Sequence, residues 1–370
     1  MGAECFGAKL LAEVQEESLA DILRSLRNSH VRDSPQQLLG IPPLDDILSI
    51  LNTNDNNNHP IIEITSPSSA DGKTALLYYA AALAVLPARL DNGVVLGGRA
   101  AAVIWLDTDG RFDASWFTRV VRTIVRKRVA PSGHEYGRML PTTVLDEALR
   151  HVHVFRPQGS ATLLATVRSI PRYLFGGGRH YSRGRAVHAV VVDSASAFYW
   201  QDWREEEVSR IPGAREDEEE KEEMEMQMRS TTMYAQGGKK SSIDIHAEIV
   251  SRLRELQSKF SCVILFTTAG LYPSRTADSL VSFRPYLPYP WPVFPTLRLV
   301  VRRDPVRPFP GEMTVDEAMA DAAARQSVVQ RGQFSGWVDL ASVPVGVRSE
   351  LGRKGGFAFR IAAEGVEFDS

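Results

Sequence analysis

Five short apolar runs, each separated from the next by segments of helical or polar character, are the feature that most limits how this chain can fold. The runs cover residues 61–65, 101–109, 151–155, 186–193 and 260–268. A strand that is apolar along its whole length has both faces buried, which occurs mainly in parallel sheets covered by helices on both sides. The pattern therefore predicts an α/β fold with a mainly parallel central sheet flanked by helices.

Helical spacing of apolar residues places helices between these strands. We expect helices over 74–86 and 113–129, and a third that begins near residue 161. Pro171 is expected to interrupt or end this third helix, because proline lacks the backbone N–H that a helix interior uses. Residues 9–27 predict one or two short amphipathic helices. Partial alternation near the end of the chain predicts strands that extend one edge of the sheet.

Composition excludes several classes of protein. The formal net charge of the 370 residues is only -2, so any DNA contact must come from a local patch or from a partner. The chain contains no run of about 18 uninterrupted apolar residues, the length that a membrane-spanning helix needs. Cys5 and Cys262 stand far apart, which argues against a disulfide framework or a cysteine metal site. These features predict a soluble intracellular protein in a reducing compartment.

The predicted organisation is one large domain with a short segment before it. Residues 1–39 form the expected N-terminal helical segment, 40–304 the core, and 305–370 a C-terminal extension of the same domain. An acidic insertion at about 204–242 divides the core. Its charge run has almost no core-forming residues, which indicates a solvated helix end or a disordered insertion, with a dedicated acidic docking site as the alternative.

The segment SPSSADGKT, residues 66–74, follows a predicted strand and ends like a phosphate-binding loop. Such a loop directs backbone N–H groups at the phosphates, a lysine at the β and γ oxygens, and a hydroxyl at the metal ion. Gly72, Lys73 and Thr74 supply the lysine and the hydroxyl in the expected order. The alternative is that these residues merely cap a buried helix.

The beginning of this loop departs from the usual pattern. The expected first glycine is replaced by Pro67, or by Ser66 if the loop is one residue longer. Either residue has less φ freedom than glycine. Asp71 adds an anion close to where phosphates would lie. We therefore expect weak nucleotide binding and slow or no hydrolysis.

Carboxylates follow two of the predicted core strands. Asp193 ends the strand AVVVD, a position from which a carboxylate commonly holds Mg²⁺ through water. Capping of the next turn through Ser194 or Ser196 is the alternative. Asp107 and Asp109 end a second strand, and one of them could polarise water. An N-cap of the following helix is the alternative for this pair.

Together these elements resemble the core of the RecA-type recombinase paralogues, a family built on a P-loop ATPase core. The segments LLGIPPLDDIL, IIEITSPSSADGKT, VIWLDTDGRFD, VVVDSASAFYW and VILFTTAG occur in the order and spacing of that family. FRPYLPYPW and FAFRIAAEGVEF add matches towards the end of the chain. The resemblance covers nearly the whole chain, apart from an Asn-rich stretch at 52–60, the acidic insertion and part of the tail.

The resemblance implies ATP and Mg²⁺ as cofactors and assigns roles to individual residues. Thr74 and Asp193 match the Mg²⁺ site, and Thr268 lies near a polar sensor position. Asp109 stands where active recombinases carry a catalytic glutamate, and its shorter side chain would misplace the attacking water by about 1 Å, at a cost on the order of 100-fold in rate. The implied nucleotide-binding residues are Ser66, Pro67, Asp71, Gly72, Lys73 and Thr74.

The sequence also departs from the family's pattern at two further places. Ala269 and Gly270 stand where a polar DNA-sensing loop would begin, and only about forty residues precede GIPPLDDIL, so the family's helical N-terminal domain is expected to be absent.

The function that the resemblance implies is homologous-recombination repair of DNA double-strand breaks and crosslinks in the nucleus. The chain would be a non-catalytic or weakly ATP-binding subunit that assembles with other recombinase paralogues. It would support the recombinase filament on single-stranded DNA and meet single-stranded or branched DNA directly or through partners. The alternative is a DNA-stimulated ATPase with genuine hydrolysis. A small-molecule kinase conflicts with the C-terminal matches.

Three further features can be interpreted as structural or as functional. The expected helix at 113–129 is basic and is either a solvated face or a contact to the DNA backbone. Three histidines on apolar strands lack metal-ligand companions at suitable spacing, so we expect structural roles for His151, His153 and His188. The aromatic run Phe198, Tyr199 and Trp200 fits core, partner surface or base stacking.

Overall fold

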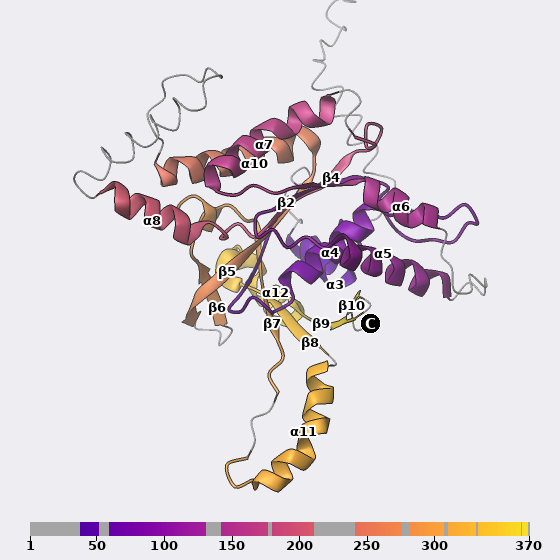
Figure 1. The fold of residues 1–370 in the computed structure, drawn as a ribbon, viewed down its shortest axis with the longest axis vertical. Helices are drawn as coiled ribbons and strands as arrows, with labels where there is room; N and C mark the ends of the chain where they lie inside the picture. The colour runs from indigo at the N-terminus through magenta and orange to yellow at the C-terminus, as the bar shows by residue number, and fades with distance from the viewer. Residues whose placement is uncertain are drawn as a thin grey trace, which may run out of the picture. The chain divides into compact units, whose positions relative to one another are not determined.

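A mainly parallel sheet runs through the centre of the computed structural model (Figure 1). Within the described residues, the order across the sheet is β10, β9, β8, β7, β1, β5, β4, β2, β3. Pairing is parallel from β7 to β3 and antiparallel from β7 to β10, and β6 pairs with the end of β5. This arrangement confirms the predicted fold class, including the C-terminal strands that extend the sheet, and it is consistent with a RecA-like core. The strands are β1 (Ile61–Ser66), β2 (Ala102–Asp107), β3 (Val152–Phe155), β4 (Val187–Asp193), β5 (Val263–Arg275), β6 (Val281–Pro285), β7 (Leu297–Arg303), β8 (Gln333–Val338), β9 (Gly356–Ala362) and β10 (Gly365–Phe368).

The structure describes residues 38–51, 59–130, 142–176, 180–210, 241–275, 281–306, 310–330, 332–363 and 365–368. The described part from Leu39 onward belongs to one compact unit. Three of the sequence expectations lie outside the described residues: the helices within 9–27, most of the Asn-rich stretch and the acidic charge run at 215–228.

One face of the sheet is covered by α7 (Ser160–Phe175) and α10 (Ser242–Phe260). Leu163, Val167 and Ile170 of α7 recur every three or four residues, and they pack with strand and α10 residues in one buried cluster. The prediction for Pro171 is wrong, because α7 continues through this residue to Phe175. The last turn packs on α10, where the rings of Phe175 and Phe260 stack at 5.7 Å, and this packing compensates for the backbone hydrogen bond that proline removes.

The opposite face carries α4 (Lys73–Val85) and α5 (Ala114–Val129). Nearly every residue of α4 is buried, because the sheet, α5 and β10 all contact this helix. Its many alanines allow these neighbours to approach closely. Asp113 caps α5 by accepting hydrogen bonds from the backbone N–H groups of Ser115 (2.8 Å) and Trp116 (3.1 Å).

The basic residues of α5 lie away from its packed face. Arg119, Arg122, Arg126 and Lys127 are exposed, whereas the apolar residues between them are buried. The Lys127 ammonium pairs with the carboxylate of Glu367 in β10 at 2.7 Å. This arrangement is that of a solvated helix face, and an exposed ion pair of this kind adds little stability.

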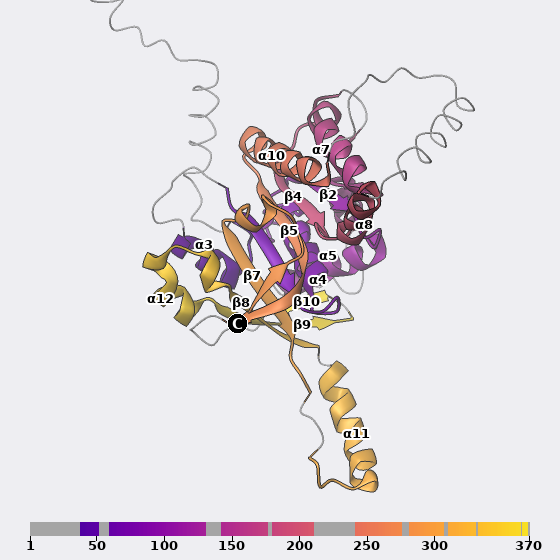
Figure 2. The ribbon, with the colours of Figure 1, turned by 90° about the vertical axis from the view of Figure 1, so that its left-hand side faces the viewer.

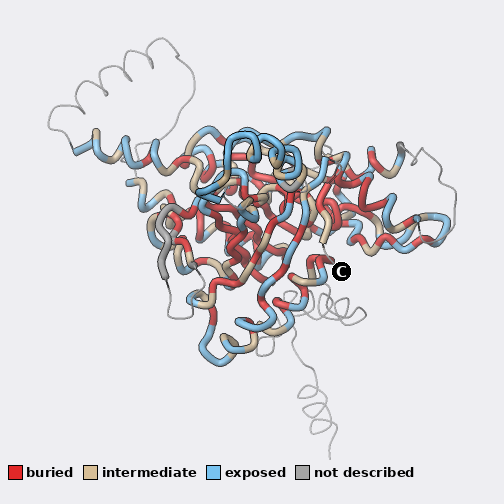
Figure 3. Tube along the Cα trace, turned by 90° about the horizontal axis from the view of Figure 1, so that it is seen from below, coloured by how far each residue is buried: buried red, intermediate tan, exposed pale blue. Residues whose placement is uncertain are grey.

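The remaining helices surround the ends of the sheet. α3 (Pro42–Leu51) and α12 (Val345–Lys354) pack against each other (Figure 2), and α8 (Tyr199–Ser209) contacts α10. α6 (Thr142–Arg150) lies beside α5 and β3, whereas α11 (Val315–Gln330) joins β7 to β8. The described residues also include the short 3-10 turns η2 (Trp291–Val293) and η3 (Leu340–Ser342). Buried residues follow the strands through the middle of the fold (Figure 3). In the described part of the chain, every helix is too short or too polar to cross a bilayer.

A buried ionic network connects β1 to β7. Glu63 is fully buried, and its carboxylate accepts a hydrogen bond from Arg298 Nε at 2.7 Å and from the Thr268 hydroxyl at 2.7 Å. Arg298 also lies 3.5 Å from Asp339. Burial raises the pKa of Glu63, and the guanidinium of Arg298 opposes this shift. Arg298 therefore compensates two buried carboxylates.

Arg298→Met should destabilise the fold by about 3 to 5 kcal/mol, because it leaves Glu63 buried without its cation. Arg302→Met changes an exposed arginine of the same strand and should cost no more than about 0.5 kcal/mol. Urea denaturation of both variants measures the difference. Equal, small losses in the two variants would contradict this account of the network.

Histidines at the β3 edge form a second buried polar cluster. The Ser182 hydroxyl lies 2.7 Å from Nδ1 of His151 and 2.7 Å from Nε2 of His153. His153 Nδ1 also lies 3.0 Å from the Tyr173 hydroxyl. Burial lowers the pKa of His153 to about 4, and the nearby rings of His180 and His151 add to this shift. These contacts give His153 of β3, and His151 just before this strand, structural roles.

Folding stability should therefore fall as the pH decreases from about 6.5 to about 4. His153 has a folded pKa of about 4 and an ordinary value of 6.5, so the unfolded chain binds more protons in this window. The neutral ring contributes stability that is fully present above pH 6.5 and lost as the pH falls through this window. With partial solvent screening the loss is on the order of 1 to 2 kcal/mol.

Urea denaturation at a series of pH values measures this loss, and His153→Gln should show a shallower pH dependence than the unmodified protein. Identical slopes for the two proteins would assign the acid sensitivity to other groups.

Candidate functional site

The candidate site lies at the carboxyl ends of the parallel strands β1, β2 and β4, beside the middle of β5. Asp107 at the end of β2 is in register with Asp193 at the end of β4. β5 runs beside both β1 and β4, and the loop after β1 leads into the N-terminus of α4. Parallel pairing thus gathers side chains that are far apart in the sequence, as in other open α/β sheets.

Asp193 is buried and hydrogen-bonded to two threonines. Its Oδ1 accepts a hydrogen bond from the Thr267 hydroxyl at 2.6 Å, and the Thr74 hydroxyl also bonds to its carboxylate. Burial raises the pKa of Asp193, and the two hydroxyl donors oppose that shift. Carboxylate and hydroxyl oxygens of this kind suit Mg²⁺, so Asp193 and Thr74 fit the metal half of a nucleotide site.

The polar β5 residue at this site is Thr267 rather than Thr268. Successive strand residues point to opposite faces. The Thr268 hydroxyl accordingly donates to Glu63 at 2.7 Å, whereas that of Thr267 reaches Asp193. Thr268, the sensor residue expected from the sequence, thus contacts Glu63, and Thr267 is the β5 hydroxyl that contacts Asp193.

Lys73 is engaged by oxygen atoms of its own loop. Its Nζ donates to the Ser66 hydroxyl and, at 3.1 Å, to the carbonyl oxygen of Ser68. Burial lowers the pKa of Lys73, while the carboxylates of Asp71 and Asp193 oppose the shift. To contact a phosphate, the ammonium group would have to exchange these oxygens for those of the ligand.

Asp71 uses the donors that a phosphate would need. Its Oδ2 accepts a hydrogen bond from the backbone N–H of Ser68 at 2.8 Å, and its Oδ1 accepts one from the backbone N–H of Arg303 at 3.0 Å. Pro67 has no N–H to offer. Asp71 therefore occupies one backbone donor of the loop and places an anion beside it. The metal half of the site fits its ligand better than the phosphate half does.

Gly72 is the point at which the loop contacts the C-terminal strands. It has a left-handed backbone with φ of 88°, which favours glycine. A Cβ atom here would lie 2.8 Å from Ile361 Cδ1 and 3.2 Å from rings of Phe334 and Phe359. The loop thus rests on side chains of β8 and β9.

The two carboxylates after β2 have different environments. Asp107 is buried and accepts hydrogen bonds from the backbone N–H of Arg111 (2.9 Å) and from Arg156 Nε (2.9 Å). It therefore holds the following turn in place. Asp109 is exposed, and its backbone N–H donates to the Asp193 carbonyl oxygen at 3.3 Å. Neither residue caps α5, because Asp113 does so.

Asp109 thus remains the candidate that could orient water. Partial burial raises the pKa of its carboxyl, and Arg111 opposes that shift.

Comparison with known proteins gives one informative match. The chain is similar to the DNA repair protein XRCC2 homolog of Arabidopsis thaliana. The two sequences are 23% identical over 284 residues, which cover 66% of this chain and 68% of the relative. No protein-family model matches the chain. At this identity the match supports a relation to RecA-like paralogues and no closer assignment.

Two residues that sequence reasoning missed help to build the site. Thr267 could have been found from the alternation of strand residues, since it differs from Thr268 only in the face to which it points. The Tyr78 hydroxyl accepts a hydrogen bond from the Asp113 backbone N–H at 2.6 Å, and its ring packs 4.9 Å from that of Trp105. Tyr78 therefore positions the turn that carries Asp109, and the sequence offers no local signal for that contact.

Asp71→Asn should tighten binding of a fluorescent ATP analogue with Mg²⁺ by about tenfold. The amide keeps the shape of the carboxylate and removes a negative charge beside the triphosphate, a change worth on the order of 1 to 2 kcal/mol. Asp91→Asn removes an exposed aspartate outside the loop and should leave the affinity unchanged. Equilibrium titration of each variant with the analogue measures the affinity. Unchanged or weaker binding by Asp71→Asn would mean that Asp71 does not compete with phosphate.

Proposed function

We propose that this chain is a recombinase paralogue that acts in homologous-recombination repair of DNA double-strand breaks and crosslinks. It serves as a non-catalytic or weakly ATP-binding subunit that assembles with other RecA-type paralogues and supports the recombinase filament on single-stranded DNA. The proposal includes a nuclear location and contact with DNA directly or through these partners. Two findings support it: the RecA-like arrangement of the sheet, and the similarity to a plant DNA repair protein.

The observation that carries the non-catalytic role is the internal hydrogen bonding of the loop after β1. Lys73 binds Ser66 and the Ser68 carbonyl, and Asp71 takes the Ser68 N–H. Fast turnover needs donors that are preorganised for the phosphates before the ligand arrives. This loop would have to break contacts of its own each time a nucleotide bound.

The proposed cofactors are ATP and Mg²⁺. Thr74 and Asp193 would hold the metal ion, which supplies charge neutralisation for the phosphates when bound. Lys73 would leave Ser66 and Ser68 to contact the phosphate oxygens. Asp193 is buried, and its hydrogen bond from Thr267 orients the carboxylate for this role.

Lys73→Ala should abolish the weak binding of a fluorescent ATP analogue and leave crosslink repair nearly intact. The reason is that assembly, rather than turnover, is the proposed task. The matched control is Lys354→Ala, which removes an exposed lysine that pairs with Glu350. Both variants are tested in cells that lack the protein, by survival after crosslinking, and in vitro by titration. A severe repair defect specific to Lys73→Ala would refute the non-catalytic role.

A DNA-stimulated ATPase is the second candidate. It is favoured by the Asp193 and Thr74 pair and by the placement of Asp109 beside Asp193. Steady-state hydrolysis is measured with partner paralogues and single-stranded DNA present, for the unmodified chain and for Lys73→Ala and Asp109→Asn. Turnover that both substitutions remove would support this candidate. Absence of turnover in the complete mixture would exclude it.

A further inference from the structure

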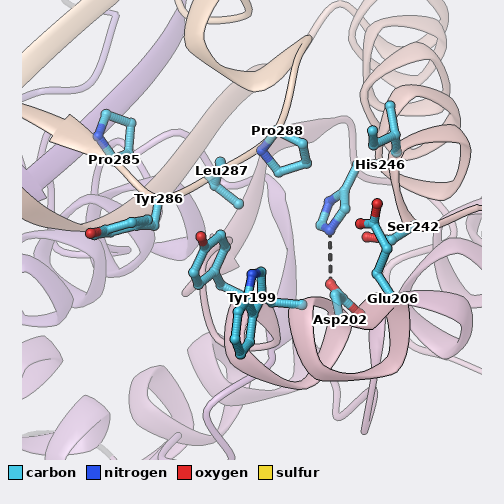
Figure 4. A pocket seen from close by; sticks show the side chains of 11 residues that line it. Tyr199, Asp202, Glu206, Ser242, His246, Pro285, Tyr286, Leu287 and Pro288 are labelled. Carbon is cyan, nitrogen blue, oxygen red and sulfur yellow. Dashed lines mark hydrogen bonds and ion pairs between the residues drawn. The ribbon is translucent and has the colours of Figure 1, made fainter. Parts of the chain in front are cut away.

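A pocket of about 440 Å³ lies between α8, the start of α10 and the segment after β6, and it is separate from the loop after β1 (Figure 4). Aromatic rings form one side of it. Tyr199 and Tyr286 pack at 4.9 Å, and Trp203 of α8, which is 51% exposed, continues the aromatic surface. Pro288 and the half-exposed Ile243 complete the apolar lining.

The floor of this pocket contains a buried carboxylate. Asp202 is only 8% exposed, and it accepts hydrogen bonds from the Ser160 hydroxyl at 2.6 Å and from His246 Nε2 at 2.8 Å. His246 Nδ1 accepts a hydrogen bond from the indole N–H of Trp291 at 3.0 Å. The proton of the neutral imidazole therefore lies on Nε2. Two uncharged donors therefore orient Asp202 without neutralising its charge.

The rim of the pocket is also acidic. Glu206 lines it, and its neighbours Glu205 and Glu207 lie on the same helix outside the lining. The Arg210 guanidinium pairs with Glu206 at 2.7 Å and with Glu207 at 2.8 Å. Residues 199–210 contain four carboxylates and two arginines, so this segment carries net negative charge beside the pocket. Phosphates of a nucleic acid would be repelled here.

Exposed aromatic faces beside carboxylates are the chemistry that recognises a guanidinium group. Its flat face stacks on aromatic rings, and its edge donates two hydrogen bonds to a carboxylate. The nearby ring of Trp200, 61% exposed and 6.1 Å from that of Trp203, extends the surface on which the rest of a peptide could lie. A pocket of this volume is large enough to admit an arginine side chain.

We propose that this pocket docks an arginine side chain from a basic segment of a partner protein. Glu206 exchanges its own partner Arg210 for the incoming guanidinium, Trp203 covers the face of that group, and Asp202 supplies the buried negative charge. Partner docking here does not depend on nucleotide at the loop after β1, so its failure would leave the nucleotide proposal untouched.

The probe is a fluorescein-labelled nonapeptide, three repeats of Gly-Ser-Arg, titrated with the full chain and followed by fluorescence anisotropy. Its matched partner carries citrulline, which has the shape of arginine without the charge. We expect the arginine peptide to bind at least tenfold more tightly than the citrulline peptide. Glu206→Gln and Trp203→Ala should each weaken the binding by at least tenfold.

The control variant is Glu205→Gln, which makes the same change of charge one residue away, where the side chain bonds to Gln201 and does not line the pocket. It should bind the peptide within about twofold of the unmodified protein. Near-ultraviolet circular dichroism and urea denaturation verify that every variant is folded.

Three outcomes would overturn the proposal. Equal losses in Glu205→Gln and Glu206→Gln would show that the peptide merely follows net charge. Equal affinity for the arginine and citrulline peptides would exclude the guanidinium. Binding of a labelled 20-nucleotide oligo-dT that Trp203→Ala weakens, with no binding of the peptide, would assign the pocket to single-stranded nucleic acid.

Discussion

The hydrogen bond from Thr267 to Asp193 joins β5 to the end of β4, and most of the candidate site depends on it. It fixes the carboxylate at the sheet edge, next to Thr74 at the start of α4. Parallel pairing of β1, β5, β4 and β2 then decides which other groups can approach. Because each of these strands is buried on both faces, the positions of their last residues cannot shift independently. The site is therefore a property of the sheet.

The two halves of this site have different physical characters. Around Asp193 the groups are oxygen atoms that a hard cation prefers, and their geometry is set by the core. In the loop after β1, the Lys73 ammonium is hydrogen-bonded to Ser66, and the Asp71 carboxylate accepts hydrogen bonds from the backbone N–H groups of Ser68 and Arg303. Both charged side chains are therefore already hydrogen-bonded within the protein. This difference is the basis for proposing an assembling subunit rather than a fast enzyme. The acidic aromatic pocket by α8 is a separate surface that contains no residue of the loop after β1.

The sequence predicted the fold and much of the site because those signals are local. Uniformly apolar runs specify buried parallel strands, and Asp193 and Asp107 mark where two of them end. Other features arise only from contacts between distant segments: the Arg303 N–H that holds Asp71, the packing that carries α7 past Pro171, and the pocket formed by Trp203, His246 and Pro288. Thr267 and Thr268 are an intermediate case. They are adjacent in β5, but their side chains point to opposite faces of the sheet, so one contacts Asp193 and the other contacts Glu63.

The contact of Gly72 with β8 and β9 couples two regions that lie more than 250 residues apart in the sequence. Phe334, Phe359 and Ile361 form the surface on which the loop rests, so loosening of the C-terminal strands would also loosen the loop. Thermodynamic linkage makes the relation reciprocal: a ligand that holds the loop in place protects β8 and β9 against local unfolding. These two strands thus support the loop, so a substitution that loosens them would also disturb the loop that follows β1 in the middle of the sheet.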